Sequence, residues 1–122
     1  MSVLVPREAL PIMERYRGRH RLFNFSDRYS SVNNLNHAIN IGLKAVAQAV
    51  GVQKLTLYAA RHSWATIATN DCGVDKYTVH ECLNHVDEAM AITDRYIQKD
   101  WSRQDKANRK VLDYVRKRLP AV

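Results

Sequence analysis

Apolar residues recur at helical spacing along the middle of the chain. After Ser30-Ser31 the apolar positions are three or four residues apart, which is the spacing of one helix face: Val32, Leu35, Ile39, Leu43, Val46 and Val50. Serine is a favoured N-cap, and Gly51 stands where a glycine commonly ends a helix. The pattern predicts one long helix that begins after Ser31 and ends before Gly51.

Shorter helices are predicted on both sides of the long one. Pro6 suits the start of a helix that extends to about Tyr16, and residues 18–27 are expected to form a loop with apolar anchors. Glycines and acidic capping residues divide the rest of the chain into helices over 58–72, 75–83, 87–97 and 102–119. The predicted fold class is mainly α, with at most a residual β segment at the N-terminus, in residues 1–5.

Composition limits the classes of protein to which the chain can belong. The 122 residues are 46% hydrophobic and 25% charged, which is typical of a globular domain and excludes disordered and collagen-like chains. No apolar run approaches the roughly 18 residues of a membrane-spanning helix, and residues 1–6 do not resemble a secretory signal. Cys72 and Cys82 alone make no disulfide framework, so we expect a protein of the reducing cytoplasm.

The formal net charge is +7, and it is unevenly distributed. Residues 1–50 carry seven bases and three acids, residues 98–122 carry eight bases and three acids, and the segment between them is slightly acidic. Basic ends around a balanced middle favour a site that is flanked by surfaces for phosphate groups. The alternative is that lysine and arginine only solvate the helix faces, and the charge pattern alone does not decide between the two.

A pair of histidines in residues 80–85 superficially resembles a zinc-protease motif. That motif places its histidines four residues apart, so that both rings reach one ion from the same helix face. His80 and His85 are five residues apart, which is about 140° around a helix, and no third ligand is near them in the sequence. We therefore expect no metal site, with His80 at the surface and Cys82 in the core.

Three short motifs follow one another in the second half of the chain. They are Arg61-His62-Ser63-Trp64-Ala65-Thr66, then Leu83-Asn84-His85, and then Thr93-Asp94-Arg95-Tyr96. In this order the chain resembles the tyrosine recombinase (phage-integrase-type) family, in style most like the integrases of Bacteroides-type mobile elements. Two positions depart from the family pattern, since Tyr58 stands where the family often has a histidine and Asn84 replaces a glycine. Asparagine tolerates a positive φ better than most residues, so the turn at Asn84 can form.

The resemblance implies a site for DNA strand cleavage and rejoining, that is, for site-specific recombination or integration. It makes Tyr96 the nucleophile that forms a 3′-phosphotyrosyl link, and it makes Arg61 and His85 ligands of the scissile phosphate. Arg61, expected in the first turn of its helix, is a planar fork that suits two phosphate oxygens, and the helix dipole adds to the attraction. The link conserves the bond energy, so no ATP, metal or cofactor is implied. Tyr58 is left open between a phosphate contact and a packing role.

Other residues of the motifs are expected to serve the fold. Trp64, Ile67 and Leu83 are predicted to lie in the core. His62 is predicted to pack and hydrogen-bond inside the fold rather than to act in catalysis.

The resemblance covers nearly the whole chain but not the whole family domain. The family has a further catalytic arginine and a lysine on a β-hairpin, both upstream of the region that residues 3–10 match, and also an N-terminal DNA-binding domain. We therefore expect residues 1–122 to be the C-terminal part of a catalytic domain, with a core portion over about 1–99 and a basic helix or tail over 100–122. This chain by itself is expected to have little activity.

The expected partner is double-stranded DNA, at the nucleoid of a bacterial cytoplasm, and no membrane is involved. The resemblance also implies a homo-oligomer on DNA in which the helix over 102–119 docks into a neighbouring protomer, and packing of this helix on its own core is the alternative. The alternative function is a non-catalytic, basic, helical DNA-binding module. Such a module would hold phosphates without forming a covalent product.

Overall fold

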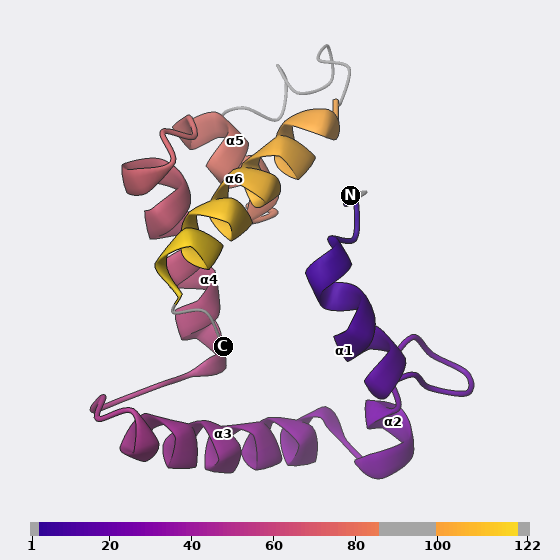
Figure 1. The fold of residues 1–122 in the computed structure, drawn as a ribbon. Helices are drawn as coiled ribbons and strands as arrows, with labels where there is room; N and C mark the ends of the chain where they lie inside the picture. Colours follow the sequence, from indigo (N-terminus) through magenta and orange to yellow (C-terminus); the bar gives the residue numbers. More distant parts are fainter. Residues whose placement is uncertain (1–2, 86–99, 120–122) are drawn as a thin grey trace. The chain divides into compact units, whose positions relative to one another are not determined.

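The structure, a computed structural model, describes residues 3–85 and 100–119. This part of the chain is mainly helical and contains no strand, which confirms the predicted mainly-α class and leaves residues 3–5 outside any β segment. Its elements, in chain order, are η1 (Arg7–Ala9), α1 (Leu10–Arg15), α2 (Phe25–Arg28), α3 (Val32–Ala49), α4 (Leu57–Thr66), η2 (Ile67–Asp71), α5 (Lys76–Cys82) and α6 (Ser102–Arg118) (Figure 1).

The chain forms two compact units. The N-terminal unit is Val5–Ala60, and the C-terminal unit combines Arg61–Val122 with Met1–Leu4. Within the C-terminal unit, the Leu4 N–H donates a hydrogen bond to Asp105 Oδ1 of α6 at 2.8 Å. The first residues of the chain therefore belong with its last helix.

The N-terminal unit begins with a 3-10 turn that leads into α1. The Pro6 carbonyl accepts a hydrogen bond from the Ala9 N–H at 2.9 Å in η1. α1 then ends at Arg15, and Tyr16 is its C-cap. The helix predicted from Pro6 to about Tyr16 is confirmed, with a tighter first turn than expected.

A closed loop, residues 17–23, follows α1. Its two ends form an isolated antiparallel bridge, and the Gly18 N–H donates to the Leu22 carbonyl at 3.2 Å. A Cβ on Gly18 would lie 2.5 Å from the Arg21 carbonyl oxygen, so only glycine fits at this close approach. The prediction of a loop over 18–27 is wrong at its end, because the last residues of that range form the one-turn helix α2.

Aromatic rings pack beside this loop. Phe23 stacks on Phe25 with 5.3 Å between the ring centroids, and Tyr16 lies 5.9 Å from Phe25 in a tilted arrangement. The Asn24 N–H donates to the Tyr16 carbonyl at 2.8 Å, which ties the end of α1 to the chain after the loop. Phe23 and Phe25 are thus confirmed as apolar anchors, whereas Leu22 is exposed.

α3 has its predicted caps but not a buried face. Ser31 Oγ accepts a hydrogen bond from the Asn34 N–H at 3.1 Å, and Gly51 has a φ of 72° after the helix. The predicted apolar stripe is half-buried at three positions and exposed at the other three: Leu35, Ile39 and Leu43, and then Val32, Val46 and Val50. Within α3, all of which is described, only Ala47 is buried. The apolar spacing therefore predicts the helix correctly, but it does not predict whether the apolar face is buried.

The C-terminal unit has a hydrophobic core. Its buried residues come from η2, the turn after η2, α5 and α6: Ala68, Val74, Val79, Ala107 and Val111. Trp64, Ile67 and Leu83 pack against this cluster, which confirms their predicted place. α6 contacts both α5 and η2 (Figure 1). Its Ala107 and Val111 are part of the core that these elements enclose.

The helix predicted over 58–72 is confirmed, but its last turn is a π-helix. In η2 the Cys72 N–H donates to the Ile67 carbonyl at 2.9 Å, five residues back. Gly73, with a φ of 61°, follows as the predicted terminator. Apolar spacing does not reveal such a turn, because the period changes for only a few residues.

The bounds of α5 and α6 and the N-cap of α5 agree with the sequence. The Asp75 carboxylate accepts hydrogen bonds from the Thr78 N–H at 2.9 Å and from the Thr78 hydroxyl at 2.7 Å, and these bonds lower the pKa of Asp75. α6 confirms the helix predicted over 102–119, whereas the helix predicted over 87–97 lies outside the described residues.

In the part of the chain that the structure describes, no helix has the length and apolar character to cross a membrane.

Candidate functional site

The second motif, Leu83-Asn84-His85, forms the C-terminal cap of α5. The Asn84 N–H donates to the Glu81 carbonyl at 2.9 Å, and the His85 N–H donates to the His80 carbonyl at 3.2 Å. Asn84 has a φ of 51°, so the turn forms with asparagine in the left-handed region, as expected. This pair of hydrogen bonds around a left-handed residue is a Schellman motif, and it fixes the direction of the chain after the helix.

The cap also sets the surroundings of His85. The His85 side chain is exposed, and its ring meets the ring of half-buried His80 edge-on, with 4.8 Å between the centroids. Both residues belong to the cap, since His80 supplies the carbonyl that the His85 N–H contacts. The turn therefore presents an imidazole at the surface from a position that the backbone defines.

Arg61 of α4 is joined to this turn. Its Nη2 donates a hydrogen bond to the Leu83 carbonyl oxygen, 22 residues further along the chain. The Arg61 residue is half-buried, so the guanidinium is oriented by the protein rather than solvated on all sides. The first and second motifs, distant in the sequence, thus meet at one point of the C-terminal unit.

Arg61 lies deeper in its helix than the sequence indicates. α4 begins at Leu57, which places Arg61 in the second helical turn and makes the prediction of a first-turn arginine wrong. The field of a helix dipole is strongest over the first turn, so its contribution at Arg61 is smaller than expected. The carbonyl of Leu83, rather than the helix end, holds the guanidinium.

A hollow of about 260 Å³ lies beside Arg61. Its lining comes from α4, the end of α5, α6 and the start of the chain: Val3, Arg61, Trp64, Cys82, Leu83, Gln104 and Asn108. A charged guanidinium beside apolar walls attracts an anion more strongly than it would in bulk water, because the local dielectric is lower. The arrangement can therefore hold a phosphate group against Arg61.

Gln104 is a residue of this hollow that sequence reasoning missed. It is 2% exposed, its Nε2 donates to Glu81 Oε2 at 3.0 Å, and its Oε1 is buried with no hydrogen-bond partner among the described residues. An unpaired buried acceptor costs about 1–3 kcal/mol, so it marks a place where packing alone does not explain the residue. Its burial could have been predicted from its position on the buried face of α6, three residues before Ala107 and seven before Val111.

Cys82 lines the hollow as an unreactive thiol. Burial, with the Glu81 carboxylate as a smaller contribution, raises the pKa of Cys82 to about 11, so the thiol is protonated at neutral pH. Cys82 packs against the core as predicted, whereas His80 is half-buried rather than at the open surface. Within residues 3–85 and 100–119, no group of three His, Cys, Asp or Glu side chains is arranged to hold a metal ion.

His62 is exposed, so the prediction that it packs inside the fold is wrong. Trp64 and Ala65 occupy the face of α4 that contacts the core. His62 lies two residues before Trp64, about 200° around the helix, and its side chain therefore leaves the opposite face.

Neither tyrosine of the predicted site is part of the contact between Arg61 and the Leu83-Asn84-His85 turn in the described structure. Tyr58, in the N-terminal unit, is 57% exposed, and Tyr96 lies outside the described residues. Of the four predicted site residues, the structure brings Arg61 together with the turn that carries His85.

Two other tyrosines compete with Tyr96 on sequence grounds, although neither has the spacing of the third motif. Tyr114 donates its hydroxyl to Asp71 Oδ1 at 2.6 Å, and this bond raises the pKa of Tyr114. A phenol in that state is a poor nucleophile. Tyr77, on α5, is half-buried.

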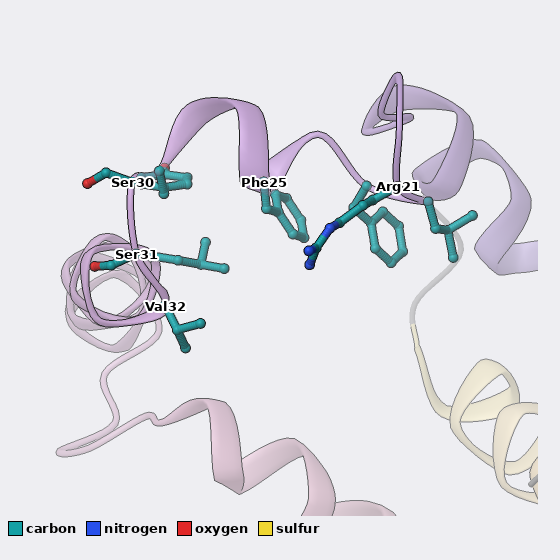
Figure 2. A pocket seen from close by; sticks show the side chains of 9 residues that line it. Arg21, Phe25, Ser30, Ser31 and Val32 are labelled. Carbon is teal, nitrogen blue, oxygen red and sulfur yellow. The ribbon is translucent and has the colours of Figure 1, made fainter.

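A second hollow, of about 460 Å³, lies in the N-terminal unit. Most of its lining is apolar and aromatic, from the loop, α2 and the start of α3. Figure 2 shows the Arg21 side chain extending towards Phe25, with Ser31 and Val32 at the beginning of α3. Arg21 is thus directed towards an apolar hollow.

The function is inferred from the motifs and from this geometry. No protein-family model, curated protein or solved structure matches the chain. The contact between Arg61 and the Leu83-Asn84-His85 turn is the observation on which an assignment depends.

Proposed function

We propose that the chain is the C-terminal part of a tyrosine recombinase catalytic domain, which cleaves and rejoins DNA for site-specific recombination. The supporting observation is the hydrogen bond from Arg61 to the Leu83 carbonyl, at the start of the turn that ends in His85. An accidental match of two short motifs gives no reason for them to meet in space. The left-handed backbone at Asn84, where the family pattern has glycine, also supports the proposal.

The proposed reaction exchanges one phosphate ester for another. The Tyr96 hydroxyl oxygen attacks the phosphorus of a DNA phosphodiester, the bond from phosphorus to the 5′ oxygen breaks, and the phenolic proton is transferred to that oxygen through solvent. A 5′ hydroxyl later attacks the 3′-phosphotyrosyl link, releases Tyr96 and rejoins the strand. The number of phosphate ester bonds is unchanged, so the exchange consumes no ATP.

The chain's own residues supply position and charge for this reaction. Arg61 is a planar fork that suits two phosphate oxygens, and His85 donates a hydrogen bond to the same phosphate. Tyr58 is a further candidate for a phosphate contact. Phosphoryl transfer depends largely on such positioning and on neutralisation of oxygen charge, because the protein has little covalent chemistry to perform.

The proposal is tested by covalent trapping. The full-length protein that carries this chain is incubated with a nicked suicide duplex whose central segment is randomised, so that the protein selects its own target. We expect a protein–DNA adduct on a denaturing gel, its loss in Tyr96→Phe, and its persistence in the matched control Tyr114→Phe. Arg61→Gln is expected to reduce the trapping rate by about 100-fold or more, the usual effect of removing one transition-state donor.

The outcomes of this experiment separate the candidate functions. Trapping by Tyr96→Phe at the wild-type level would show that Tyr96 is not the nucleophile. Binding of DNA without any covalent product would replace the recombinase by the non-catalytic DNA-binding module. Since no motif of residues 1–122 matches the family's further arginine and lysine, we expect this chain alone to trap little DNA.

Assembly on DNA is a further part of the proposal. Homo-oligomerisation on double-stranded DNA, at the nucleoid, accompanies recombination in this scheme. α6 buries Ala107 and Val111 in its own unit, so exchange of this helix between protomers would have to expose that face. Light scattering of the protein, free and bound to DNA, tests whether protomers assemble on the duplex.

A further inference from the structure

A basic hollow lies in the N-terminal unit between the closed loop and α2. It has a volume of about 620 Å³ and is lined only by polar and charged side chains: Arg17, Arg19, His20, Asn24, Asp27 and Arg28. No apolar side chain lines it, in contrast to the hollow that Arg21 enters. The two hollows of this unit therefore suit different ligands.

The basic hollow has an excess of positive charge. Arg17 is paired with Glu14 at 3.4 Å, but both side chains are exposed and such a pair is weak. Among the residues that the structure describes, no carboxylate forms an ion pair with Arg19 or Arg28. Asp27 is the one acid of the lining, which therefore carries three guanidinium groups and a single carboxylate.

The loop that carries this charge is held by its backbone. The loop is closed by the bridge between its ends and by the hydrogen bond from the Gly18 N–H to the Leu22 carbonyl. The close approach of Gly18 to the Arg21 carbonyl depends on the absence of a side chain at residue 18. A loop that is already closed loses little entropy when a ligand binds, which favours a contact surface over a solvated turn.

We propose that the basic hollow binds the phosphate backbone of double-stranded DNA, as a contact in addition to Arg61. Guanidinium groups match phosphate oxygens in pairs, and protein–DNA interfaces are polar, wet and positively charged, as this lining is. Stable protein–protein interfaces typically have an apolar or aromatic centre, which the basic hollow lacks, so its lining favours DNA over a protein partner. The choice of DNA as the polyanion rests on the proposed function, but the contact needs no cleavage chemistry. The basic hollow is expected to bind DNA of any sequence, because phosphate groups carry no sequence information.

The first test measures the salt dependence of binding. The chain is titrated into a labelled duplex of arbitrary sequence at several salt concentrations, and binding is followed by fluorescence anisotropy. Each phosphate contact contributes about 0.9 to the slope of log affinity against log salt. We expect Arg19→Gln/Arg28→Gln to reduce that slope by nearly two units and to weaken binding by about ten- to hundredfold. The control Lys44→Gln/Lys54→Gln removes the same net charge from the same unit and is expected to change the slope by less than half as much.

The second test keeps the charge and changes the loop. Gly18→Ala forces the new Cβ against the Arg21 carbonyl, whereas a Cβ at Gly42 meets nothing within 4 Å. We expect Gly18→Ala to weaken DNA binding by about three- to tenfold and Gly42→Ala to leave it unchanged, as for a preformed contact. Circular dichroism monitors folding, and if Gly18→Ala does not fold, the arginine variants still decide the question.

Three results would overturn the proposal. They are an unchanged salt slope in Arg19→Gln/Arg28→Gln, an equal loss in the lysine control, and tighter binding of polyglutamate than of the duplex. The last result would instead indicate an acidic protein partner. These outcomes concern non-covalent binding, so they are distinct from the covalent trapping that tests Tyr96.

Discussion

The two longest helices in the part of the chain that the structure describes, α3 and α6, differ in what they pack against. α3 has 18 residues and α6 has 17, and each carries an apolar stripe at helical spacing. α6 buries Gln104, Ala107 and Val111, whereas α3 buries only Ala47 although α3 is the more apolar helix of the two. Spacing decides that a helix forms, but burial depends on the elements that fold against it.

This contrast extends to the units that contain the helices. In the C-terminal unit, α5, η2 and α6 enclose one cluster of buried side chains. The N-terminal unit depends more on local devices, namely caps, a closed loop and stacked aromatic rings. We therefore expect the same substitution to have different costs in the two units.

The largest difference is expected for a charge placed on each stripe. Val111→Asp buries a carboxylate without a partner at a site that is 4% exposed, and it should lower the free energy of unfolding by about 3 kcal/mol or more. Val46→Asp, at a site that is 48% exposed, should cost less than about 1 kcal/mol. Urea denaturation followed by circular dichroism measures both. Equal costs would mean that α3 is as well packed as α6.

The turns after α3 and α5 give a second comparison. Asn84 and Gly51 both have positive φ, of 51° and 72°, so a valine at either position is strained by about 1–2 kcal/mol. Asn84→Val should in addition disturb the cap that positions His85, and it should reduce DNA trapping more than Gly51→Val does. Thermal unfolding and the trapping assay measure the two effects, and Asn84→Gly, which keeps the backbone, is the control. Normal trapping by Asn84→Val would show that DNA trapping does not depend on the cap of α5.

The N-caps of α3 and α5 differ in their response to pH. Ser31→Ala and Asp75→Ala should each cost about 1 kcal/mol at neutral pH. The folded protein lowers the pKa of Asp75, so the carboxylate stabilises the fold above its unfolded pKa of about 3.9, and this contribution is lost as the pH falls through the folded value. The cost of Asp75→Ala should therefore disappear in acid, while that of Ser31→Ala should not. Urea denaturation at a series of pH values measures both, and parallel curves would contradict the assignment.

The smallest expected effect is a gain. Gly42 lies inside α3, where an added Cβ would meet no atom within 4 Å beyond the backbone of its own helix, so Gly42→Ala should raise the free energy of unfolding by about 0.5–1 kcal/mol. Gly18→Ala should instead lower it, because the loop has no room for a Cβ. Differential scanning calorimetry of the two variants compares an open glycine with a constrained one. A loss of stability in Gly42→Ala would mean that the exposed side of α3 is covered in solution.

Local signals predicted most of the elements. Ser31, Asp75, Gly51 and Gly73 act where they stand in the sequence, because a cap needs only the few residues around it. The one-turn helix α2 and the π turn of η2 were missed, since each is shorter than the window in which a period can be recognised.

The candidate site was predictable in part. The ordered motifs singled out Arg61 and His85, and an asparagine at the glycine position of the family pattern pointed to the left-handed turn at Asn84. Long-range contacts were not accessible in the same way. The exposed face of His62, the buried Gln104 and the hydrogen bond from Arg61 to Leu83 all depend on how α4, α5 and α6 meet.

Because the Schellman cap of α5 is made by the main chain, the side chain at residue 85 can be replaced without moving the backbone. The main chain there is held by hydrogen bonds between backbone atoms, from the Asn84 and His85 N–H groups to carbonyls of α5. A different side chain at residue 85 would therefore start from the same point in space. A series of replacements, His85→Gln, His85→Lys and His85→Ala, would vary the hydrogen-bond donor while the scaffold stays constant. The end of this short helix thus fixes where the side chain of residue 85 begins, whatever that side chain is.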